Sequence, residues 1–525
     1  MKYFITTAID YTNAPPHIGH AYEKIFADTI GRYHRLVDGT AFFLTGVDQH
    51  GQKVQQAAQR EGIAPMEFAQ RVTDKFLELW DKLGIQKDGW AATTDPRHKR
   101  AVQKVLQALY EKGELYKAKY SGYYSVGQEQ FLTDKDRNEK GEFGSEWGQI
   151  VFIEEENWYF RLAKHKDWLK AFVEAREDFV IPAFRRAELL NAIDRLGGDL
   201  CVSRPKERLS WGIEFPFDPG YVTYVWFDAL LNYITFAGYL ADADTGLPNF
   251  KELWPCRGHI IGKDILIPAH GIYWPIMLHA IGFADEEMPR LVVHGWWNFS
   301  GAKMSKSVGN VVDPALLIER FGPDPIRYYL MRDMIIGQDA DFSEDRLVAL
   351  YNAELANDLG NLLNRTINMS QRYRSGVLRS MPAADPDLAA IREDVSTTVT
   401  RYKQAFESYQ VHLALEAVRE LAAKANALVE LKAPWRLAKD PGSAELLDAV
   451  LYTLAETCRI LALLVSPIIP PSSTKMLAQL NAGKAATLAW GELATGHRIG
   501  APSPVFPKID GAGGESGEWK VESRQ

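Results

Sequence analysis

The sequence predicts an α/β protein in which a parallel sheet is split by a small inserted domain and followed by a bundle of helices. Three observations support this prediction. Residues 1–116 alternate apolar, strand-like runs with helical patterns, as βαβ units around a parallel sheet do. Residues 117–222 break that alternation, and beyond about residue 344 the strand patterns give way to Ala- and Leu-rich segments. A chain of 525 residues, 46% of them hydrophobic, has room for about two to four domains with sizeable cores.

The parallel sheet is expected to be Rossmann-like and to be built from residues 1–116 and 223–343. In both parts, apolar runs of strand length stand next to helical patterns. The runs that predict strands are at 3–9, 40–47, 257–262 and 290–294. The second part also holds helical patterns at 226–241 and 270–282.

The inserted connective domain is expected to span residues 117–222, which are rich in aromatic and charged residues. Its turn signals are Gly122, Gly127, Gly141, Gly144 and Gly148. We expect aromatic side chains to form its core. They are Tyr123, Tyr124, Phe131, Trp147, Phe152, Trp158 and Phe160.

The all-α bundle is expected over residues 344–508. Its helical patterns are at 344–374, 386–430 and 444–466. Pro467, Pro470 and Pro471 interrupt the helices near the end of the bundle. Residues 509–525 are rich in Gly, Ser and Glu, which predicts a disordered tail.

The segment Pro15-Pro16-His17-Ile18-Gly19-His20 has the pattern of an anion site at a helix start. Thr12 and Asn13 are good helix caps, and the two prolines suit a first turn. A helix that starts at His17 presents free amides and two imidazoles to phosphoryl oxygens. Gly19 lets a flat ligand lie against the backbone.

A second segment, Lys303-Met304-Ser305-Lys306-Ser307, is polar and flanked by Gly and Ser. Lys303 and Lys306 would act as mobile point charges on a polyphosphate. Alone, a serine–lysine run is more often a solvated loop, and a His-x-Gly-His pattern is not decisive either. Together, in this order on a long α/β chain, the two segments indicate a nucleotide-activating site. They resemble the signature pair of class I aminoacyl-tRNA synthetases.

Composition narrows the class of protein further. Cys201, Cys256 and Cys458 form neither a disulfide framework nor a Cys-x-x-Cys pair, which suits a reducing cytoplasm and predicts three inert core thiols. The sequence has no export signal pattern and no long uncharged apolar run, so export and membrane spanning are not expected. A formal net charge of −8 argues against a general nucleic-acid binder and leaves room for a local basic patch.

Two further clusters have both a structural and a functional interpretation from residue type alone. Asp48 follows a strand, where it is either a loop carboxylate or the partner of a substrate ammonium, because ligands bind at the carboxyl ends of parallel strands. Residues 226–230 and Tyr233 are either core residues of a helix start or the wall of a binding site.

Several collinear segments between residues 3 and 508 resemble the methionyl-tRNA synthetase family. They are Ala8 to Tyr11, the turn at 45–51, Tyr224 to Ala229, Ile261 to Ile265, His270 with Tyr273 to Pro275, His294-Gly295, Asn357 to Asn361 and Ala433 to Trp435. The resemblance implies a methionine–tRNA ligase, which activates L-methionine with ATP to methionyl adenylate and pyrophosphate and then transfers methionine to the 3′ end of its tRNA. Residues 1–116 and 223–343 would be the catalytic domain, and 344–508 the anticodon-binding domain.

The resemblance also implies roles for individual residues. Catalytic groups would be His17, His20, Lys303 and Lys306, with Mg²⁺ sharing the charge of ATP. ATP would contact His17, Gly19, His20, Gly262, Asp264, Lys303, Ser305 and Lys306. Methionine would be surrounded by Ala8, Ile9, Tyr11, Asp48, Trp226, Ala229, Leu230, Tyr233, Ile265 and His270, whose rings and apolar walls suit a thioether and whose tyrosine and histidine donors would reach its sulfur. The anticodon would be read by Asn357, Asn361, Arg365 and Trp435, although from residue type alone Trp435 is equally a core residue.

Two departures from the family pattern bear on these assignments. The stretch from Asp264 to Trp274 is one residue longer than the commoner spacing, which affects the placement of the residues inside it. Ser125 and Gln128 stand where a Cys-x-x-Cys would be expected in the inserted domain. Structural zinc needs Cys or His ligands at short spacings, so no structural zinc is expected.

Three functional hypotheses remain at this stage. The first is a methionine–tRNA ligase. The second is a related synthetase for another amino acid, but its branched-chain members carry a much longer insertion than residues 117–222. The third is a synthetase-derived protein that binds RNA without catalysis. Against it argue four intact residues: His17, His20, Lys303 and Lys306. The favoured enzyme would be cytoplasmic, would charge initiator and elongator tRNAs, and would bind neither DNA nor membranes. We expect a monomer, because only a polar tail follows the bundle.

Overall fold

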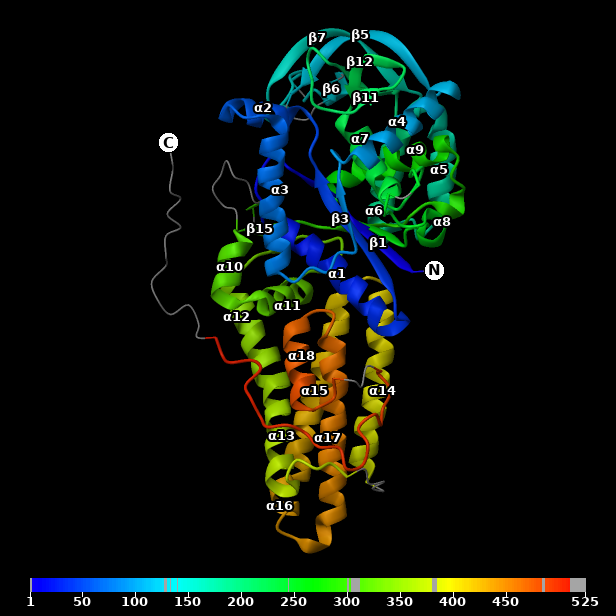
Figure 1. Cartoon of the computed structure of the whole chain (residues 1–525). Coiled ribbons are helices and arrows are strands. Elements are labelled where there is room, and N and C mark those ends of the chain that lie inside the picture. Colours follow the sequence, from blue (N-terminus) through cyan, green and yellow to red (C-terminus); the bar gives the residue numbers. More distant parts are fainter. Residues whose placement is uncertain are drawn as a thin grey trace. The chain divides into compact units, whose positions relative to one another are not determined.

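The computed structural model describes residues 2–126, 130–132, 134–138, 140–243, 245–299, 302–303, 312–379, 385–483 and 487–509 (Figure 1). The chain divides into two compact units. The first comprises Met1–Pro16, Phe42–Glu78 and Gln86–His294, and the second comprises His17–Ala41, Leu79–Ile85 and Gly295–Gln525. Both units therefore draw on distant parts of the sequence.

The first unit is built on a seven-stranded sheet with the order β2-β3-β1-β13-β14-β8, in which β4 also pairs with β3. The strands are β1 Tyr3–Thr7, β2 Asp10–Tyr11, β3 Ala41–Asp48, β4 Gly89–Ala92, β8 Val180–Ile181, β13 Gly258–Gly262 and β14 Leu291–His294. The pairs β1–β13, β13–β14, β14–β8, β2–β3 and β3–β4 are parallel. The four predicted strands are confirmed, whereas β2, β4 and β8 are too short to leave an apolar run in the sequence.

Helices pack on this sheet because its strands are apolar on both faces. The helices of the first unit are α2 Gln52–Glu61, α3 Pro65–Lys82, α4 Pro96–Glu111, α5 Lys166–Ala175, α6 Ala183–Asp194, α7 Val225–Thr235, α8 Phe250–Leu253, the π-type η5 Leu266–Tyr273 and α9 Trp274–Ile281. The last residues of α3, from Leu79 on, belong to the second unit. The helix predicted over 226–241 ends early, at Thr235. The chain then turns through Gly238 at φ +101°, where a Cβ would stand 2.0 Å from the Pro248 carbonyl oxygen.

Two antiparallel sheets occupy the predicted insertion. One has the order β6-β5-β7-β9, from β5 Leu115–Ser125, β6 Gln130–Leu132, β7 Ile150–Phe160 and β9 Leu200–Cys201. The other has the order β10-β12-β11, from β10 Ser203–Pro205, β11 Glu214–Phe215 and β12 Asp218–Thr223.

The aromatic residues of the insertion do not all form its core, as the sequence had suggested they would. Tyr124, Trp158 and Phe160 are buried. Tyr123 and Phe152, which are partners across β5 and β7, are 42% and 63% exposed. Successive residues of a strand point to opposite faces, so a strand that buries Tyr124 must expose Tyr123.

The second unit is mainly helical, as predicted. Its helices are α1 Ile18–Asp38, α10 Pro314–Phe321, α11 Pro323–Asp333, α12 Glu344–Leu350, the π-type η7 Tyr351–Gly360, α13 Asn361–Arg374, α14 Pro386–Glu407, α15 Val411–Lys432, α16 Pro434–Leu437, α17 Ala444–Val465 and α18 Pro470–Gln479. A small sheet, β16-β15-β17, joins β15 Trp297–Phe299, β16 Ala302–Lys303 and β17 Ala340–Asp341. Helices α13, α14 and α15 all contact α17, which is buried nearly all round (Figure 1).

Helix α1 is fixed to the bundle at its C-terminal half. The ring of Tyr33 stacks on Phe406 with a centroid distance of 4.2 Å, and its hydroxyl donates to Glu407 at 3.2 Å. The buried Arg327 donates to Asp28 of α1 at 2.6 Å and to the carbonyl oxygen of Ile468 at 2.6 Å. An aromatic stack and a buried ion pair therefore hold α1 and the bundle in one unit.

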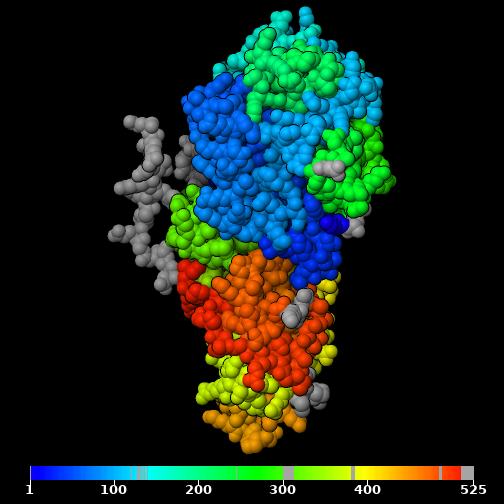
Figure 2. Space-filling model, viewed as in Figure 1, coloured from blue at the N-terminus to red at the C-terminus, as the bar shows by residue number. Residues whose placement is uncertain are grey.

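The last described residues run over the surface of the bundle, as the red atoms in Figure 2 show. Gly500 donates its amide to Gln479 at 2.7 Å, and Asn352 donates to Ile509 at 2.7 Å. Residues 510–525, most of the predicted tail, lie outside the described residues. Within the part of the chain that the structure describes, no helix is long and apolar enough to cross a membrane.

All three cysteines are free, but only two of them are core thiols. Burial raises the pKa of both Cys256 and Cys458 to about 12, so these thiols are unreactive at neutral pH. Cys201 is half-buried, and its sulfur lies 3.4 Å from a guanidinium nitrogen of Arg204. The prediction of three core thiols is therefore wrong for Cys201.

Candidate active site

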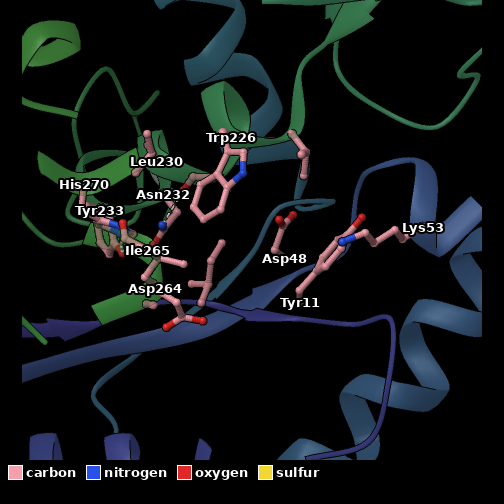
Figure 3. A pocket seen from close by; sticks show the side chains of 14 residues that line it. Tyr11, Asp48, Lys53, Trp226, Leu230, Asn232, Tyr233, Asp264, Ile265 and His270 are labelled. Carbon is pink, nitrogen blue, oxygen red and sulfur yellow. Dashed lines mark hydrogen bonds between the residues drawn. The ribbon is translucent and has the colours of Figure 1, made fainter. Parts of the chain in front are cut away.

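A cavity of about 350 Å³ lies in the first unit, beside the carboxyl ends of β1, β3 and β13 (Figure 3). Its lining is Ala8, Ile9, Tyr11, Asp48, Lys53, Val225, Trp226, Ala229, Leu230, Asn232, Tyr233, Asp264, Ile265 and His270. The ten residues predicted to surround an amino acid are all among them. The structure therefore brings together residues that are up to 262 positions apart, since Ala8 and His270 share one cavity.

One side of the cavity carries its charged groups, around the end of β3. Tyr11 and Asp48 are partners in the parallel pair of β2 and β3, so both side chains stand at the same sheet edge. Thr12 fixes the backbone there, because its amide and its hydroxyl both donate to the Asp48 carbonyl oxygen at 3.0 Å. The Asp48 carboxylate accepts from the Thr93 hydroxyl at 3.3 Å. It is thus a buried, oriented carboxylate at a cavity, which suits a substrate ammonium.

The other side of the cavity is apolar and aromatic, with Leu230, Tyr233 and His270 around Ile265 (Figure 3). His270 Nδ1 donates to the Ile265 carbonyl oxygen at 2.9 Å. The neutral ring then accepts at Nε2, so the Tyr233 hydroxyl donates to it at 2.8 Å. Both donor hydrogens are engaged within the protein, so this wall offers a ligand its shape and its ring surfaces rather than these two donors. The expected donors to sulfur are present, but in this arrangement they point at each other.

A buried layer behind this wall holds Tyr233 in place. Its ring stacks on His259 with a centroid distance of 4.2 Å. Thr6 lies 2.6 Å from His259 Nδ1, and the Trp274 indole donates to its Nε2 at 3.1 Å. Burial lowers the pKa of His259 well below its usual value, so the ring is neutral and accepts the hydrogen bond from the indole.

A second buried network, which the sequence analysis missed, joins the two sides of the cavity. Asp228 of α7 lies 2.5 Å from His50 Nδ1 and 2.7 Å from His98 Nε2. Burial would raise the pKa of Asp228, but the charge of His50 and the hydrogen bonds from both rings outweigh it and lower this pKa to about 2. Asp228 thereby ties the turn that presents Asp48 to the helix that presents Trp226.

The residue that departs from the family spacing is accommodated in a wide turn. Residues Leu266–Tyr273 form π-type turns that include an extended residue, Ile267, at φ −117°. A π-type turn holds more residues than an α-helical turn, so it has room for an additional residue. Ile265 and His270, on either side of Ile267, both line the cavity.

The residues predicted to contact a nucleoside stand at the end of β13. A Cβ on Gly262 would lie 2.6 Å from Asp264 Oδ1, so glycine is required for the carboxylate to approach the backbone. Asp264 is exposed and also lines the cavity. An exposed carboxylate beside bare backbone suits a ribose.

The signature histidines lie in the second unit, and the predicted cap of their helix is wrong. The cap is not Thr12 or Asn13 but His17, whose Nδ1 accepts from the Gly19 amide at 3.1 Å. His20 Nδ1 accepts from the His17 amide at 3.1 Å, and the two rings lie 3.9 Å apart. Because both Nδ1 atoms accept, each neutral ring carries its proton on Nε2 and is a donor there.

Gly19 is also explained by this arrangement, because a Cβ there would stand 2.9 Å from the His17 ring.

The lysine signature is described only in part. The backbone of Lys303 is part of β16, whereas Ser305 and Lys306 lie outside the described residues. Their roles therefore stay predictions.

The four residues predicted to read an anticodon come from three helices: Asn357 from η7, Asn361 and Arg365 from α13, and Trp435 from α16. Asn357 and Asn361 are exposed, and Trp435 is 36% exposed, so the core interpretation of Trp435 is not favoured. Arg365 stands over the Trp435 ring at 6.0 Å and donates to Glu430 at 2.6 Å. Ala433, in the left-handed region at φ +43°, ends α15 and lets Pro434 begin the short helix that presents the indole.

The predicted absence of a zinc knuckle concerns Ser125 and Gln128. Ser125 donates to the Trp147 carbonyl oxygen at 2.5 Å, while Gln128 lies outside the described residues. Among the residues that the structure does describe, no group of three or more His, Cys, Asp or Glu side chains could hold a metal ion. Whether the insertion binds zinc stays a prediction for experiment.

Four residues of the cavity lining had not been predicted to contact an amino-acid ligand: Lys53, Val225, Asn232 and Asp264. Asn232 donates to the Ala229 carbonyl oxygen at 2.6 Å, and its buried Oδ1 has no partner within the described chain. Helical spacing was a signal for it, because Asn232 lies three residues after Ala229.

Comparison with known proteins links both parts of this arrangement to one family. Residues 3–141 and 147–367 match the family of class I tRNA synthetases designated M. Residues 381–522 match the anticodon-binding domain of methionyl-tRNA ligase. Together these matches cover the cavity, the histidine signature and the bundle.

Individual relatives agree over nearly the whole chain. The methionine–tRNA ligase of Bacillus subtilis is 40% identical over 529 residues, which cover 97% of this chain and 78% of the relative. That of Thermotoga maritima is 40% identical over 518 residues, covering 97% and 81%. The structure of Mycobacterium tuberculosis methionyl-tRNA synthetase in complex with methionyl-adenylate matches with a TM-score of 0.88 and 36% identity, covering 97% of this chain and all of the other.

Proposed function

Because the chain belongs to the methionyl-tRNA synthetase family of class I tRNA synthetases, we propose that its 350 Å³ cavity binds the methionine substrate through the ten predicted residues. The enzyme activates methionine with ATP and charges tRNA. The observation that carries the proposal is the cavity itself, in which an oriented carboxylate, Asp48, faces an aromatic wall built on Tyr233 and His270. Asp48 binds the ammonium group and the aromatic wall receives the thioether.

The first step needs no protein nucleophile. An oxygen of the methionine carboxylate forms a bond to the α-phosphorus of ATP, and the bond from that phosphorus to the bridging oxygen breaks. The bonding pair leaves on pyrophosphate, and no proton moves. Catalysis is then positioning and charge stabilisation: His17 and His20 donate from Nε2 to phosphoryl oxygens, while Lys306 and secondarily Lys303 act on the leaving group.

When bound, Mg²⁺ supplies Lewis-acid stabilisation of the phosphates. We place no protein ligand for it, because Mg²⁺ is commonly held by the phosphates themselves and by water. Gly262 and Asp264 take the nucleoside. Residues 1–116 and 223–343 act as the catalytic domain, 117–222 as the inserted connective domain, and 344–508 as the anticodon-binding domain.

In the second step, a hydroxyl oxygen of the terminal ribose of tRNA forms a bond to the methionyl carbonyl carbon, and the bond from that carbon to the phosphate oxygen breaks. AMP leaves with the bonding pair, and its phosphate takes up the hydroxyl proton. Arg365 stands beside the exposed Trp435, on which an unstacked base can stack, and the exposed amides of Asn357 and Asn361 can read base edges. We further propose a cytoplasmic monomer that charges both initiator and elongator tRNAs.

Pyrophosphate exchange with a panel of amino acids tests the proposal. Exchange should depend on methionine and be weak with leucine, isoleucine and valine. Exchange driven best by a branched amino acid would identify a related synthetase instead. No exchange with any amino acid, together with tRNA binding, would identify a protein that binds RNA without catalysis.

A further inference from the structure

We propose that Lys53 is a further catalytic residue of this site, whose ammonium binds the methionine carboxylate and then the α-phosphate oxygens of the adenylate. This inference rests on the proposed function of the cavity. Neither signature motif contains Lys53, and the sequence analysis assigned it no role.

The charges of the lining support this role. Three of its residues are charged: Asp48, Asp264 and Lys53. Methionine enters as a zwitterion, so its ammonium and its carboxylate each need a partner of opposite charge. Asp48 matches the ammonium, and among the lining residues only Lys53 carries a positive charge for the carboxylate.

The position of Lys53 agrees with this pairing. In Figure 3, Lys53 and Tyr11 lie on the same side of the cavity as Asp48, while Leu230, Tyr233 and His270 lie on the other side of Trp226. The Lys53 Nζ stands 5.9 Å from the centroid of the Tyr11 ring. A methionine whose thioether contacts the aromatic wall would therefore direct its two charged groups towards Asp48 and Lys53.

Local backbone structure fixes where Lys53 emerges. Helix α2 begins at Gln52, and its cap, Gly51, has φ +102° and offers no side-chain hydrogen bond to the first turn. A Cβ on Gly51 would lie 2.4 Å from the Tyr11 hydroxyl, so only glycine lets α2 begin this close to the cavity. The amides and the dipole of the first turn add positive potential in the region that Lys53 occupies.

The chemistry of activation explains why a cation is useful there. A carboxylate must approach the α-phosphate of ATP, and both groups are anionic. A lysine that contacts both offsets their repulsion and stabilises the charge on the non-bridging oxygens as the new bond forms. The simpler alternative is that Lys53 only covers the Tyr11 ring, which would contribute packing but no dependence on the carboxylate.

The test compares Lys53→Gln with Arg60→Gln, which removes the same charge from the exposed far end of α2. Binding of methionine and of methioninol, which has an alcohol in place of the carboxylate, is measured by calorimetry. We expect Lys53→Gln to weaken methionine about tenfold or more and to leave methioninol unchanged, because only the carboxylate loses its charged partner. Methionine-dependent exchange should fall by about 10²-fold or more, since the charge on the α-phosphate loses its partner as well. Arg60→Gln should match the unmodified enzyme in all three measurements.

Lys53→Arg keeps the charge and should restore much of the methionine affinity. Equal weakening of methionine and methioninol, or exchange by Lys53→Gln at the rate of Arg60→Gln, would overturn the inference. A lowered melting temperature in Lys53→Gln with methionine affinity unchanged would show that the lysine only packs on Tyr11. Failure of the unmodified enzyme to exchange with methionine would instead refute the proposed function.

Discussion

The cavity proposed for methionine and the residues proposed for the anticodon use aromatic side chains in opposite ways. Tyr233 is 1% exposed and is held by a stack on His259 and a hydrogen bond to His270. Trp435 is 36% exposed, at the start of a four-residue helix, with Arg365 beside it. A small ligand is recognised by a wall whose every atom is already placed, whereas an RNA base needs an open face on which to stack. The four predictions below test this contrast, in order of decreasing effect.

Asp48→Asn should have the largest effect. It removes the charge that faces the substrate ammonium and keeps the size of the side chain. We expect kcat/KM for methionine in pyrophosphate exchange to fall by about 10²- to 10³-fold, since a buried charge loses its partner. Steady-state exchange at several methionine concentrations measures it. A matched loss with Asp264→Asn, which should act on ATP instead, would contradict a separate ammonium site.

Trp435→Ala should reduce aminoacylation of tRNA by about 10- to 10²-fold, because stacking of a base on an aromatic ring is worth about 1–3 kcal/mol. Exchange, which needs no tRNA, should stay intact. The control is Leu413→Ala, which truncates another exposed apolar side chain of the bundle, 47% exposed. Equal losses in both assays, together with a lower melting temperature, would identify Trp435 as a structural residue.

Asp228→Asn tests whether the cavity depends on its buried network. We expect KM for methionine to rise about tenfold with KM for ATP unchanged. The substitution weakens the hydrogen bonds that hold Asp48 and Trp226 in place, and even a small displacement of a positioned group is costly. The network also predicts a pH dependence. The pKa of Asp228 is lowered from 3.8 to about 2, so its contribution to folding stability, about 2 kcal/mol, is present above pH 3.8 and is lost as the pH falls towards 2.

Thermal unfolding between pH 5 and pH 2 measures this loss. The unmodified enzyme should lose stability more steeply over this range than Asp228→Asn, which lacks the titrating carboxylate. Parallel curves for the two proteins would show that Asp228 does not carry the contribution.

Removal of metal should have no effect on the stability of the protein, which is the smallest effect expected here. With serine and glutamine in place of a cysteine pair, the purified protein should contain no stoichiometric zinc, and a chelator should leave its melting temperature unchanged. Elemental analysis measures the zinc content. One tightly bound zinc per chain would reveal ligands that the spacing of Cys and His does not show.

Most residues that line the cavity could be predicted from the sequence, but few of the buried residues that hold them in place could. Trp226 and His270 could be located from the sequence, because both lie in short motifs that resemble the family. The Asp228 network could not be found this way, since its three members come from elements that only the fold brings together. The cap at His17 was missed because capping preferences favour short hydroxyl, carboxylate and amide side chains, although an imidazole Nδ1 accepts the same amide.

The exposed aromatic residues of the insertion could have been foreseen. Tyr123 and Tyr124 are adjacent in a strand, so only one of them could enter a core on one face of the sheet. The expectation of an aromatic core was based on composition and therefore included both residues. The two-residue period of a strand would have assigned only one of them to the core. The early end of α7 needed the tertiary structure, because the carbonyl that crowds Gly238 comes from Pro248.

The attachment of α1 to the bundle has a mechanical consequence. This helix has 21 residues and is therefore about 32 Å long, with the signature histidine at one end and Tyr33 and Asp28 fixed nearer the other. The nearer fixed point, Asp28, is 11 residues from His17 and so about 16 Å away. Pivoting the helix there by about 4° would move the imidazoles by about 1 Å, a displacement that can change a catalytic rate by about 10²-fold. Small adjustments among the bundle helices would therefore reach the histidines together with the buried residues of α1 that lie between them.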